Sequence, residues 1–327
     1  MKPILRALVI ALLVLFLIHL SVPLGSMASL RKVSDYPMLE MDMYGEPFLV
    51  PENAAGVRRL VEWLYPDAIQ RPRDISCSLV AARGDTGMIY GRNFDWYRTV
   101  PILFRVHPTA NRYASVSMVD GSYLGVRGDG SWMDRMNAAG GYIAPFDGMN
   151  EKGLFIGIAM VRSVDVPSDP AKETLTGVQM VRRILDTCAT VKEAGELVGQ
   201  YNVDFFPGPH LHFLIADGAG DSLIVEFTAE GALLIPSSRY ACATNFVMRG
   251  EEQETWAGRC DRFDALVAAS SEDVTMTGDR MMELLSSVKQ QLEKGRTEWS
   301  AVYSTDGTVT VCLGMDYDRH YSFQMKP

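Results

Sequence analysis

The chain has 327 residues, of which 47% are hydrophobic and 22% are charged. These proportions are typical of a folded globular protein and exclude an intrinsically disordered chain. The formal net charge is -9, and no run of Lys and Arg follows the N-terminus. Nucleic acid is therefore not expected as a partner, because binding to phosphates requires a basic surface.

The first 28 residues have the pattern of a secretory signal peptide. Lys2 and Arg6 are positively charged, residues 7–20 are almost wholly apolar, and small side chains lie at Ser26 and Ala28. We expect cleavage after Ala28, which would export the rest of the chain to the periplasm or the extracellular space. The alternative is an uncleaved membrane anchor, although the apolar run is short beside the ~20 residues of a typical membrane-spanning helix.

Residues 29–76 are expected to form a pro-segment or a covering arm rather than an independent domain. They contain one helical pattern at 54–65, with apolar residues at the i, i+3, i+4 and i+7 spacing of a single helix face. A Pro-rich, charged stretch at 70–74 follows this pattern.

The next stretch, at residues 75–96, predicts a β-hairpin. It consists of a strand pattern, a turn rich in Gly and Asp, and a second strand pattern. Folding at this turn brings Phe94 about opposite Cys77, and places Arg92 and Asp95 within a residue or two of the Cys77 backbone. A sulfur, a cation and a carboxylate are therefore expected to converge at one end of the hairpin.

The rest of the chain alternates sheet-rich and helix-rich blocks. Four helices are predicted. One lies at 176–187, a second begins after Thr190 as its cap, and the others lie at about 254–269 and at 279–292. This order favours stacked sheets with helices outside them, which is a layered α+β domain. Strands are predicted at 113–119, 123–126, 154–161, 211–216, 222–228, 232–235, 240–245, 299–304, 308–313 and 321–325.

Five cysteines are present, and none of them belongs to a CxxC pair, so neither a zinc site nor a disulfide framework is indicated. In an oxidising compartment an odd number leaves at least one free thiol or one thiol that pairs with another chain. We interpret Cys188, Cys242 and Cys312 as small core residues, because they lie on helix and strand patterns. Cys77 is the exception and is a candidate nucleophile.

Standard motifs for other chemistries are missing from the sequence. It contains no GxGxxG or GxxxxGK[ST] nucleotide loop and no GxSxG nucleophile turn. His210 and His212 form an HxH pair that could bind a metal, but no third His or nearby Cys/Asp cluster completes such a site. A buried strand histidine is the better interpretation of His212, and no metal or organic cofactor is expected.

Several motifs, in the same order along the chain, resemble the linear amide C–N hydrolases. The resemblance runs from about residue 75 to the end and is to the N-terminal-nucleophile group of choloylglycine hydrolases. This group includes bile salt hydrolases and penicillin V acylases, with acyltransferase and acid-ceramidase-like relatives. The motifs are Cys77, GRNFD at Gly91–Asp95, DGMNEKGL at Asp147–Leu154, ATN at Ala243–Asn245 and TEWSAVY at Thr297–Tyr303.

The resemblance implies a four-layer αββα sandwich over residues 77–327 and a self-processed nucleophile. The chain would be cut between Ser76 and Cys77. The new α-amine of Cys77 has an unperturbed pKa of about 7.7–8.0, so it could take the thiol proton without a histidine. Attack on an amide carbonyl would give a thioester, which water would then hydrolyse.

The resemblance also implies roles for four other side chains. Asp95 would orient the α-amine, and Arg92 would favour the thiolate. Asn245 would donate its side-chain amide to the oxyanion. Arg262 resembles a further family arginine near the site, on a match of only two residues. The alternatives are a surface ion pair between Arg92 and Asp95, a turn residue at Asn245 and a buried core thiol at Cys77.

One departure concerns the substrate. Bile salt hydrolases have an Asn where this chain has Met160, so bile salt specificity is in doubt. The DGMNEKGL stretch is interpreted as a structural turn before a buried strand. Apolar residues that could line an acyl-chain pocket, or simply pack in the core, are Trp132, Met133, Met136, Tyr142 and Phe205–Pro207.

The sequence therefore predicts an exported, autoprocessed cysteine amidase that acts on a small-molecule acyl amide. An acyltransferase, in which an amine resolves the thioester, is one alternative. A non-catalytic, membrane-tethered binding protein is the other, although retention of Cys77, Arg92, Asp95 and Asn245 argues against it. Membrane contact is expected only through an uncleaved N-terminal segment, and a homo-oligomer is left open.

Overall fold

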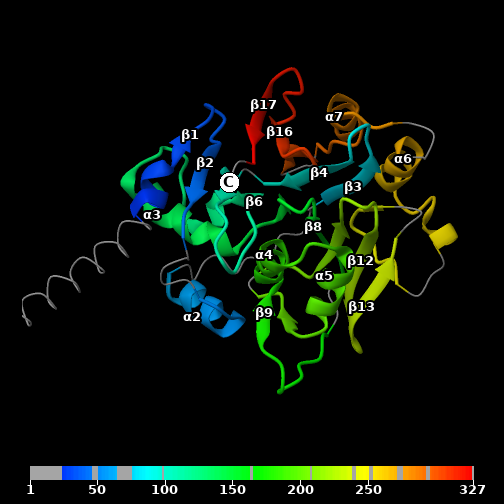
Figure 1. Cartoon of the computed structure of the whole chain (residues 1–327), viewed down its shortest axis with the longest axis horizontal. Helices are drawn as coiled ribbons and strands as arrows, with labels where there is room; N and C mark the ends of the chain where they lie inside the picture. Colours follow the sequence, from blue (N-terminus) through cyan, green and yellow to red (C-terminus); the bar gives the residue numbers. More distant parts are fainter. Residues whose placement is uncertain are drawn as a thin grey trace, which may run out of the picture.

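The structure, a computed structural model, describes residues 24–45, 51–64, 76–97, 99–162, 165–206, 208–237, 241–249, 253–270, 275–291 and 295–325. These residues form two large β-sheets that stack on each other, with helices on the two outer faces (Figure 1). The predicted signal sequence up to residue 23 and the charged stretch at 70–74 lie outside the described residues.

The six-stranded sheet has the order β14-β3-β4-β15-β16-β17, and all its neighbouring strands are antiparallel. Helices α6 (Asp261–Ala269) and α7 (Gly278–Ser287) cover its outer face. Its strands are β3 (Ser76–Arg83), β4 (Met88–Trp96), β14 (Cys242–Ala243), β15 (Arg296–Ser304), β16 (Thr308–Leu313) and β17 (His320–Gln324).

The nine-stranded sheet has the order β1-β2-β5-β6-β7-β8-β11-β12-β13. Helices α4 (Gly177–Thr187) and α5 (Val191–Val198) cover its outer face. Its strands are β1 (Arg31–Lys32), β2 (Leu39–Met43), β5 (Pro101–Val106), β6 (Ser115–Asp120), β7 (Asp147–Asn150), β8 (Phe155–Met160), β11 (Leu211–Ala216), β12 (Ser222–Thr228) and β13 (Gly231–Pro236).

The remaining elements are short and lie around these layers. They are the helices α2 (Ala54–Leu64) and α3 (Trp132–Ala139), the 3-10 helices η2 (Gly121–Leu124), η3 (Gly140–Ile143) and η4 (Gln253–Trp256), and the parallel pair of β9 (Thr174–Thr176) and β10 (Asn202–Asp204).

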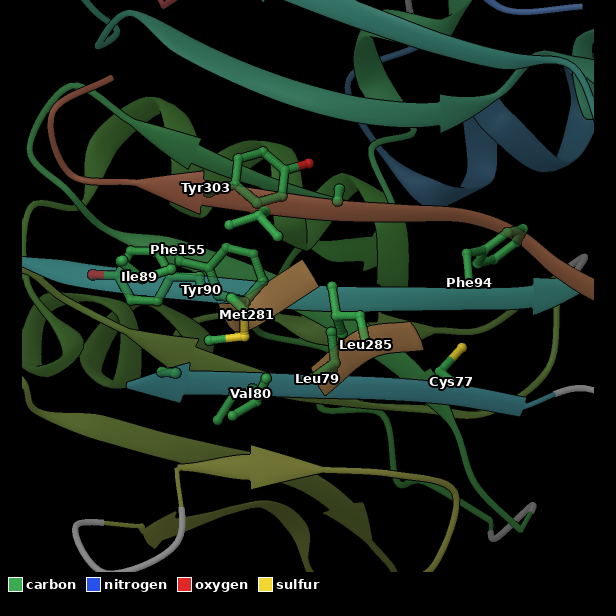
Figure 2. Packing of buried hydrophobic residues seen from close by; sticks show 14 of the residues in the cluster. Cys77, Leu79, Val80, Ile89, Tyr90, Phe94, Phe155, Met281, Leu285 and Tyr303 are labelled. Atoms are coloured by element: carbon green, nitrogen blue, oxygen red, sulfur yellow. The ribbon is translucent and has the colours of Figure 1, made fainter. Parts of the chain in front are cut away.

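Large buried side chains fill the space between the two sheets (Figure 2). Tyr90 of β4 stacks on Phe155 of β8 with ring centroids 5.0 Å apart, and Tyr303 of β15 packs against Phe155. Gly157 of β8 permits this close approach, because a Cβ there would lie 2.5 Å from Leu79 Cδ2. Together with the helix layers, the two sheets make the four-layer αββα sandwich, so the predicted α+β fold is confirmed.

The predicted hairpin and one predicted helix cap are both present. β3 and β4 pair with Cys77 opposite Phe94, and Ser76 opposite Asp95. The register follows from the position of the turn, since strand residues alternate with a period of two. Thr190 caps α5 by accepting a hydrogen bond from the backbone N–H of the third helical residue, as expected for a hydroxyl N-cap.

Two predicted elements differ from the structure. The strand expected at 123–126 is wrong, because Asp120 caps the 3-10 helix η2 and Gly125 ends it in a left-handed conformation with φ 71°. The helix expected at about 254–269 is in fact η4 followed by α6, which begins at Asp261. Local turn chemistry overrides the hydrophobic pattern in the first of these two places.

Part of the segment before Cys77 belongs to the nine-stranded sheet. β2 pairs in parallel with β5, from Leu39 opposite Ile102 to Met43 opposite Val106. Leu39 is fully buried at this junction. The sheet edge formed by β1 and β2 is therefore built from residues that precede the predicted cleavage site.

Candidate active site

The candidate nucleophile lies at the start of a central strand. Cys77 is the second residue of β3 and is buried, and Figure 2 shows it at the end of the strand where the chain enters the sheet. Leu79 of the same strand packs against Gly157 of the other sheet. Val80 and Met281 of α7 instead pack together against β4. Because strand side chains alternate, Cys77 shares the inter-sheet face with Leu79.

Arg92 lies next to the Cys77 thiol, between the two sheets. Its guanidinium Nη2 lies 3.7 Å from Cys77 Sγ, and its Nη1 donates a 2.5 Å hydrogen bond to the Ile158 carbonyl of β8. Its Nε forms an ion pair with Asp147 Oδ2 at 2.9 Å, and both side chains are fully buried. Tyr303 donates its hydroxyl hydrogen to Asp147 Oδ1. The guanidinium is therefore fixed by the nine-stranded sheet while it faces the sulfur.

Burial raises the pKa of the Cys77 thiol above its ordinary value. The cations Arg92 and Arg262 and a backbone hydrogen bond at Met160 oppose this shift, whereas Asp95 adds to it. The desolvation effect is the largest, so the thiol is protonated in the uncleaved chain at neutral pH. Reaction at this sulfur therefore requires a base that accepts its proton.

Asp95 lies on the face of β4 that is opposite to the face with Arg92. Its Oδ1 accepts a 2.5 Å hydrogen bond from Thr297 Oγ1, and its Oδ2 lies 3.9 Å from Arg262 Nη1. Within the described part of the chain, Oδ2 has no hydrogen-bond partner although it is buried. Burial raises the pKa of Asp95 to about 6, against the opposing effects of Thr297, Arg262 and Arg92. A buried carboxylate oxygen is thus available to a donor at the start of β3.

Arg92 and Asp95 do not form the surface ion pair that was the alternative interpretation. Both side chains are fully buried. Arg92 pairs with Asp147 on the inter-sheet face, while Asp95 faces Thr297 and Arg262. Residues three apart on a strand point to opposite faces, so each can act on a different part of the Cys77 residue.

Asn245 and Arg262 surround the backbone of Cys77. Asn245 Oδ1 accepts hydrogen bonds from Cys77 N–H at 2.6 Å and from Arg262 Nη2 at 3.1 Å. Its Nδ2 donates to the Met160 carbonyl at 2.8 Å and carries a second hydrogen. Arg262 Nη1 donates to the Cys77 carbonyl and, at 3.0 Å, to Ser78 Oγ. Arg262, which had the least support from sequence, thus contacts Cys77 directly.

His212 supports the backbone beside Asn245. It is fully buried on β11, which confirms its interpretation as a strand histidine. Its Nε2 lies 2.7 Å from the Thr244 carbonyl, and its Nδ1 lies 3.4 Å from Glu226 Oε1. Since a carbonyl oxygen only accepts, Nε2 carries a proton. Among the residues the structure describes, no group of three His, Cys, Asp or Glu could hold a metal ion.

Sequence reasoning missed the role of Asp147. The DGMNEKGL stretch was interpreted as a turn, and Asn150 does hold that turn, because its Oδ1 accepts from the N–H groups of Lys152 and Leu154. Asp147, at the start of the same stretch, is instead the buried partner of Arg92. A carboxylate before a near-continuous apolar run was the signal, since a buried charge requires a partner.

Three residues considered for an acyl-chain pocket lie on the surface. Trp132, Met133 and Met136 of α3 are 57%, 60% and 50% exposed. Tyr142 is buried, but its hydroxyl donates to Asp186 Oδ2 at 2.8 Å. Neither a pocket lining nor core packing therefore describes these three side chains of α3, because both would bury them.

A family model of the linear amide C–N hydrolases, choloylglycine hydrolase family, matches residues 77–246 of the chain. The chain belongs to this family. The matched region covers more than half of the sequence and begins at Cys77. The resemblance inferred from the motifs is thereby confirmed, and the protein is a hydrolase that acts on linear amides. Cys77, Arg92, Asp95 and Asn245 lie within the matched region, and Arg262 lies beyond it.

Several solved structures are similar in fold. A mutant of conjugated bile acid hydrolase from Clostridium perfringens is 16% identical with a TM-score of 0.57, over 76% of this chain and 92% of that one. Penicillin V acylase from Agrobacterium tumefaciens is 19% identical with a TM-score of 0.56, over 76% and 86% of the respective chains. At these identities the likeness shows the shared fold.

Proposed function

We propose that this protein is a self-processed cysteine amidase that hydrolyses a linear amide of a small molecule through a thioester at Cys77. The observation that carries the proposal is that different side chains contact the sulfur and the backbone nitrogen of Cys77. Arg92 faces its sulfur, whereas Asn245 holds its backbone nitrogen. The family match that begins at this residue supports the same assignment.

Self-processing would start from the thiol and the peptide bond that precedes it. The Cys77 sulfur adds to the Ser76 carbonyl carbon, and the C–N bond to Cys77 breaks as the nitrogen takes the proton. Water then hydrolyses the resulting thioester between Ser76 and the Cys77 sulfur. This leaves a carboxylate on Ser76 and a free α-amine on Cys77. Arg262, which contacts the Cys77 carbonyl and Ser78 Oγ, keeps the first residues of β3 in place during this step.

Amide hydrolysis would then use the new amine as the base. The α-amine takes the proton of the buried thiol, and the thiolate attacks the substrate carbonyl carbon. The amine of the substrate leaves with that proton, and a thioester remains on Cys77. Water, deprotonated by the α-amine, attacks the thioester and releases the acid. The second hydrogen of Asn245 Nδ2 is the proposed donor to the oxyanion.

The state of Asp95 explains why an amine fits this site. The carboxyl is buried, has one oxygen without a hydrogen-bond partner in the described chain, and has its pKa raised to about 6. A protonated amine beside it would supply both a hydrogen bond and a positive charge. Formation of the α-amine is therefore expected to lower the pKa of Asp95 and to relieve an unfavourable feature of the precursor.

This leads to a pH-dependent stability of the uncleaved chain. Asp95 has a folded pKa of about 6 against an ordinary value of 3.8. Because the folded pKa is the higher one, the protonated Asp95 carboxyl makes its full contribution to stability at pH values below the unfolded pKa of 3.8. This contribution is lost as the pH rises through about 6. The cleavage-deficient variant Cys77→Ala should thus lose about 2 kcal/mol of unfolding free energy between pH 4 and pH 6.5 from this group.

Urea unfolding across that pH range measures the effect. The matched control is Cys77→Ala/Asp95→Asn, which has no ionisable group at this position and should lack this part of the pH dependence. Superimposable pH profiles for the two variants would show that Asp95 is not destabilised by ionisation.

Processing is also expected to leave two chains that remain bound to each other. β2 precedes the cleavage site, yet it is inserted beside β5, with Leu39 buried. Arg105 of β5 forms ion pairs with Glu40 at 2.8 Å and Asp42 at 3.0 Å. Buried apolar area is not weakened by salt, so these contacts should hold the N-terminal chain after the peptide bond is cut.

Purification through a C-terminal tag tests this expectation. The fragment that ends at Ser76 should co-purify in buffer with high salt and leave only under denaturing conditions. An active enzyme from which that fragment washes away under native conditions would contradict the role of β2 as a permanent strand.

The amidase activity itself is tested with a panel of N-acyl amino acids, penicillin V and N-acylethanolamines, by measurement of the released amine. Hydrolysis and acyl transfer are distinguished by a competing amine, because a transferase would form the exchanged amide. Absence of amine release from every substrate, with Cys77 at a free N-terminus, would favour a binding protein instead.

A further inference from the structure

One face of α3 is apolar and open to solvent. Trp132, Met133 and Met136 are each at least half exposed, and their spacing of i, i+1 and i+4 places them on one side of the helix. Single exposed apolar residues are common, whereas three large ones on adjacent turns mark an interaction surface. Neither the proposed chemistry nor the core of the sandwich uses these side chains.

This face lies beside the point where the N-terminal apolar segment joins the body of the protein. Arg135 of α3 donates from Nη1 to the carbonyls of Met27 and Ala28, both at 2.9 Å. Leu24, just before them, is 41% exposed. Figure 1 shows α3 next to β1 and β2 at the same end of the molecule. In the sequence, the apolar run at residues 7–20 ends shortly before the residues that contact α3.

The residues around the predicted cleavage site are part of the fold. Ser26 is 1% exposed, and its Oγ accepts a 2.9 Å hydrogen bond from the Tyr44 backbone N–H. Ser29 Oγ accepts from Asp42 N–H of β2, also at 2.9 Å. Cleavage after Ala28 would remove Ser26 from its buried position and leave Tyr44 N–H without that acceptor. These contacts favour retention of the N-terminal segment over its removal.

We propose that Leu24 and the apolar face of α3 form a lipid-docking surface, which rests on the bilayer into which the uncleaved N-terminal segment inserts. Trp and Met suit this position, because an indole ring prefers the interface between headgroups and acyl chains and a thioether chain adapts to disordered lipid. A second attachment matters here, since the apolar run at 7–20 is shorter than the ~20 residues of a full span. Among the described residues, no helix has the length and apolarity to cross a membrane.

The contact of Arg135 with Met27 and Ala28, which follow the apolar segment in the sequence, favours a bilayer over a second copy of the chain or over the chain's own residues 7–20 as the occupant. This proposal does not depend on the reaction at Cys77, so an inactive enzyme could still dock, and a non-docking variant could still hydrolyse a soluble amide.

The test uses the full chain in phosphatidylcholine vesicles with and without brominated acyl chains, which quench nearby indole fluorescence. Trp132 should be quenched, and Trp132→Leu should remove that component while it keeps the surface apolar. The described indoles of Trp96, Trp256 and Trp299 are buried and serve as a constant background. Met133→Ser/Met136→Ser keeps the Trp132 reporter and should lose most of the lipid-dependent quenching.

The matched control is Leu233→Ser/Leu234→Ser on β13, where two leucines are 38% and 42% exposed. This variant should retain the full quenching of Trp132. N-terminal sequencing of the vesicle-bound protein should find residues before Leu24. Unquenched Trp132, a chain that begins at Ser29, or cross-linking of two copies through α3 would each overturn the proposal.

Discussion

Replacement of Cys77 by Ala is expected to abolish both cleavage of the Ser76–Cys77 bond and hydrolysis of linear amides. Loss of a catalytic nucleophile lowers kcat by roughly 10⁴–10⁶-fold in comparable enzymes. The same sulfur is proposed to act first on its own chain and then on the substrate, so both activities should disappear together. The alanine side chain fits the buried site without a new polar group, and the variant should therefore fold.

Two measurements read out the Cys77→Ala variant. Intact mass and N-terminal sequence should show an uncut Ser76–Cys77 position, in contrast to a wild-type chain that begins at Cys77. Amine release from the acyl-amide panel should fall to the background rate. Cys77→Ser is the matched comparison, because it keeps a weaker nucleophile at the same position and should process slowly.

Either of two results would reject the assignment. One is amide hydrolysis by Cys77→Ala at the wild-type rate, which would place the nucleophile elsewhere. The other is a fully active wild-type enzyme in which residues 29–76 stay covalently attached, since no α-amine base would then exist.

Asp147→Asn is expected to destabilise the fold by about 3–5 kcal/mol, because it leaves the guanidinium of Arg92 buried without its counter-charge. The substitution keeps the shape of the side chain and an oxygen that can accept from Tyr303. Arg92→Met should cost less. Burial already raises the pKa of Asp147, and Arg92 opposes that shift. Without Arg92 the carboxyl can take up a proton, whereas a guanidinium cannot lose one.

The double variant Arg92→Met/Asp147→Asn separates structure from chemistry. It removes both charges, so its stability should recover most of the loss seen in Asp147→Asn. Its activity should stay low, by about 10²-fold or more, because the guanidinium that lies 3.7 Å from Cys77 Sγ is then missing. Urea unfolding and amine release measure the two quantities on the same samples.

Two results for the double variant would contradict these expectations. If the double variant is as unstable as Asp147→Asn, the pair is not coupled, and the contact between the two side chains does not govern their energetics. If its activity returns to the wild-type level along with its stability, Arg92 acts only as a structural residue.

The sequence alone determined the local geometry of Cys77 within its hairpin. The hairpin register that sets Cys77 opposite Phe94 follows from turn position and from the two-residue period of a strand, which are short-range properties. The motif order also identified the family, which the match over residues 77–246 bears out. The predicted cap at Thr190 belongs to the same class, since it depends on a hydroxyl and the first turn of a helix.

Only the tertiary structure decided which groups meet from different elements. The ion pair of Arg92 with Asp147 and the contacts of Arg262 with Cys77 depend on how two sheets and a helix layer stack. A one-residue change in strand register would turn Cys77, Arg92 or Asp147 to the other face of its sheet. Periodicity in the sequence shows that a face is buried and does not show which element covers it.

The exposed face of α3 is the opposite case. From the sequence, its Trp and Met residues are interpreted as pocket or core side chains, because apolar residues often line ligand pockets or pack in the core. The fold leaves Trp132, Met133 and Met136 uncovered beside the N-terminal segment. Composition and spacing determine that a helix has an apolar side, and only the packing of the whole chain determines whether protein or solvent lies against it.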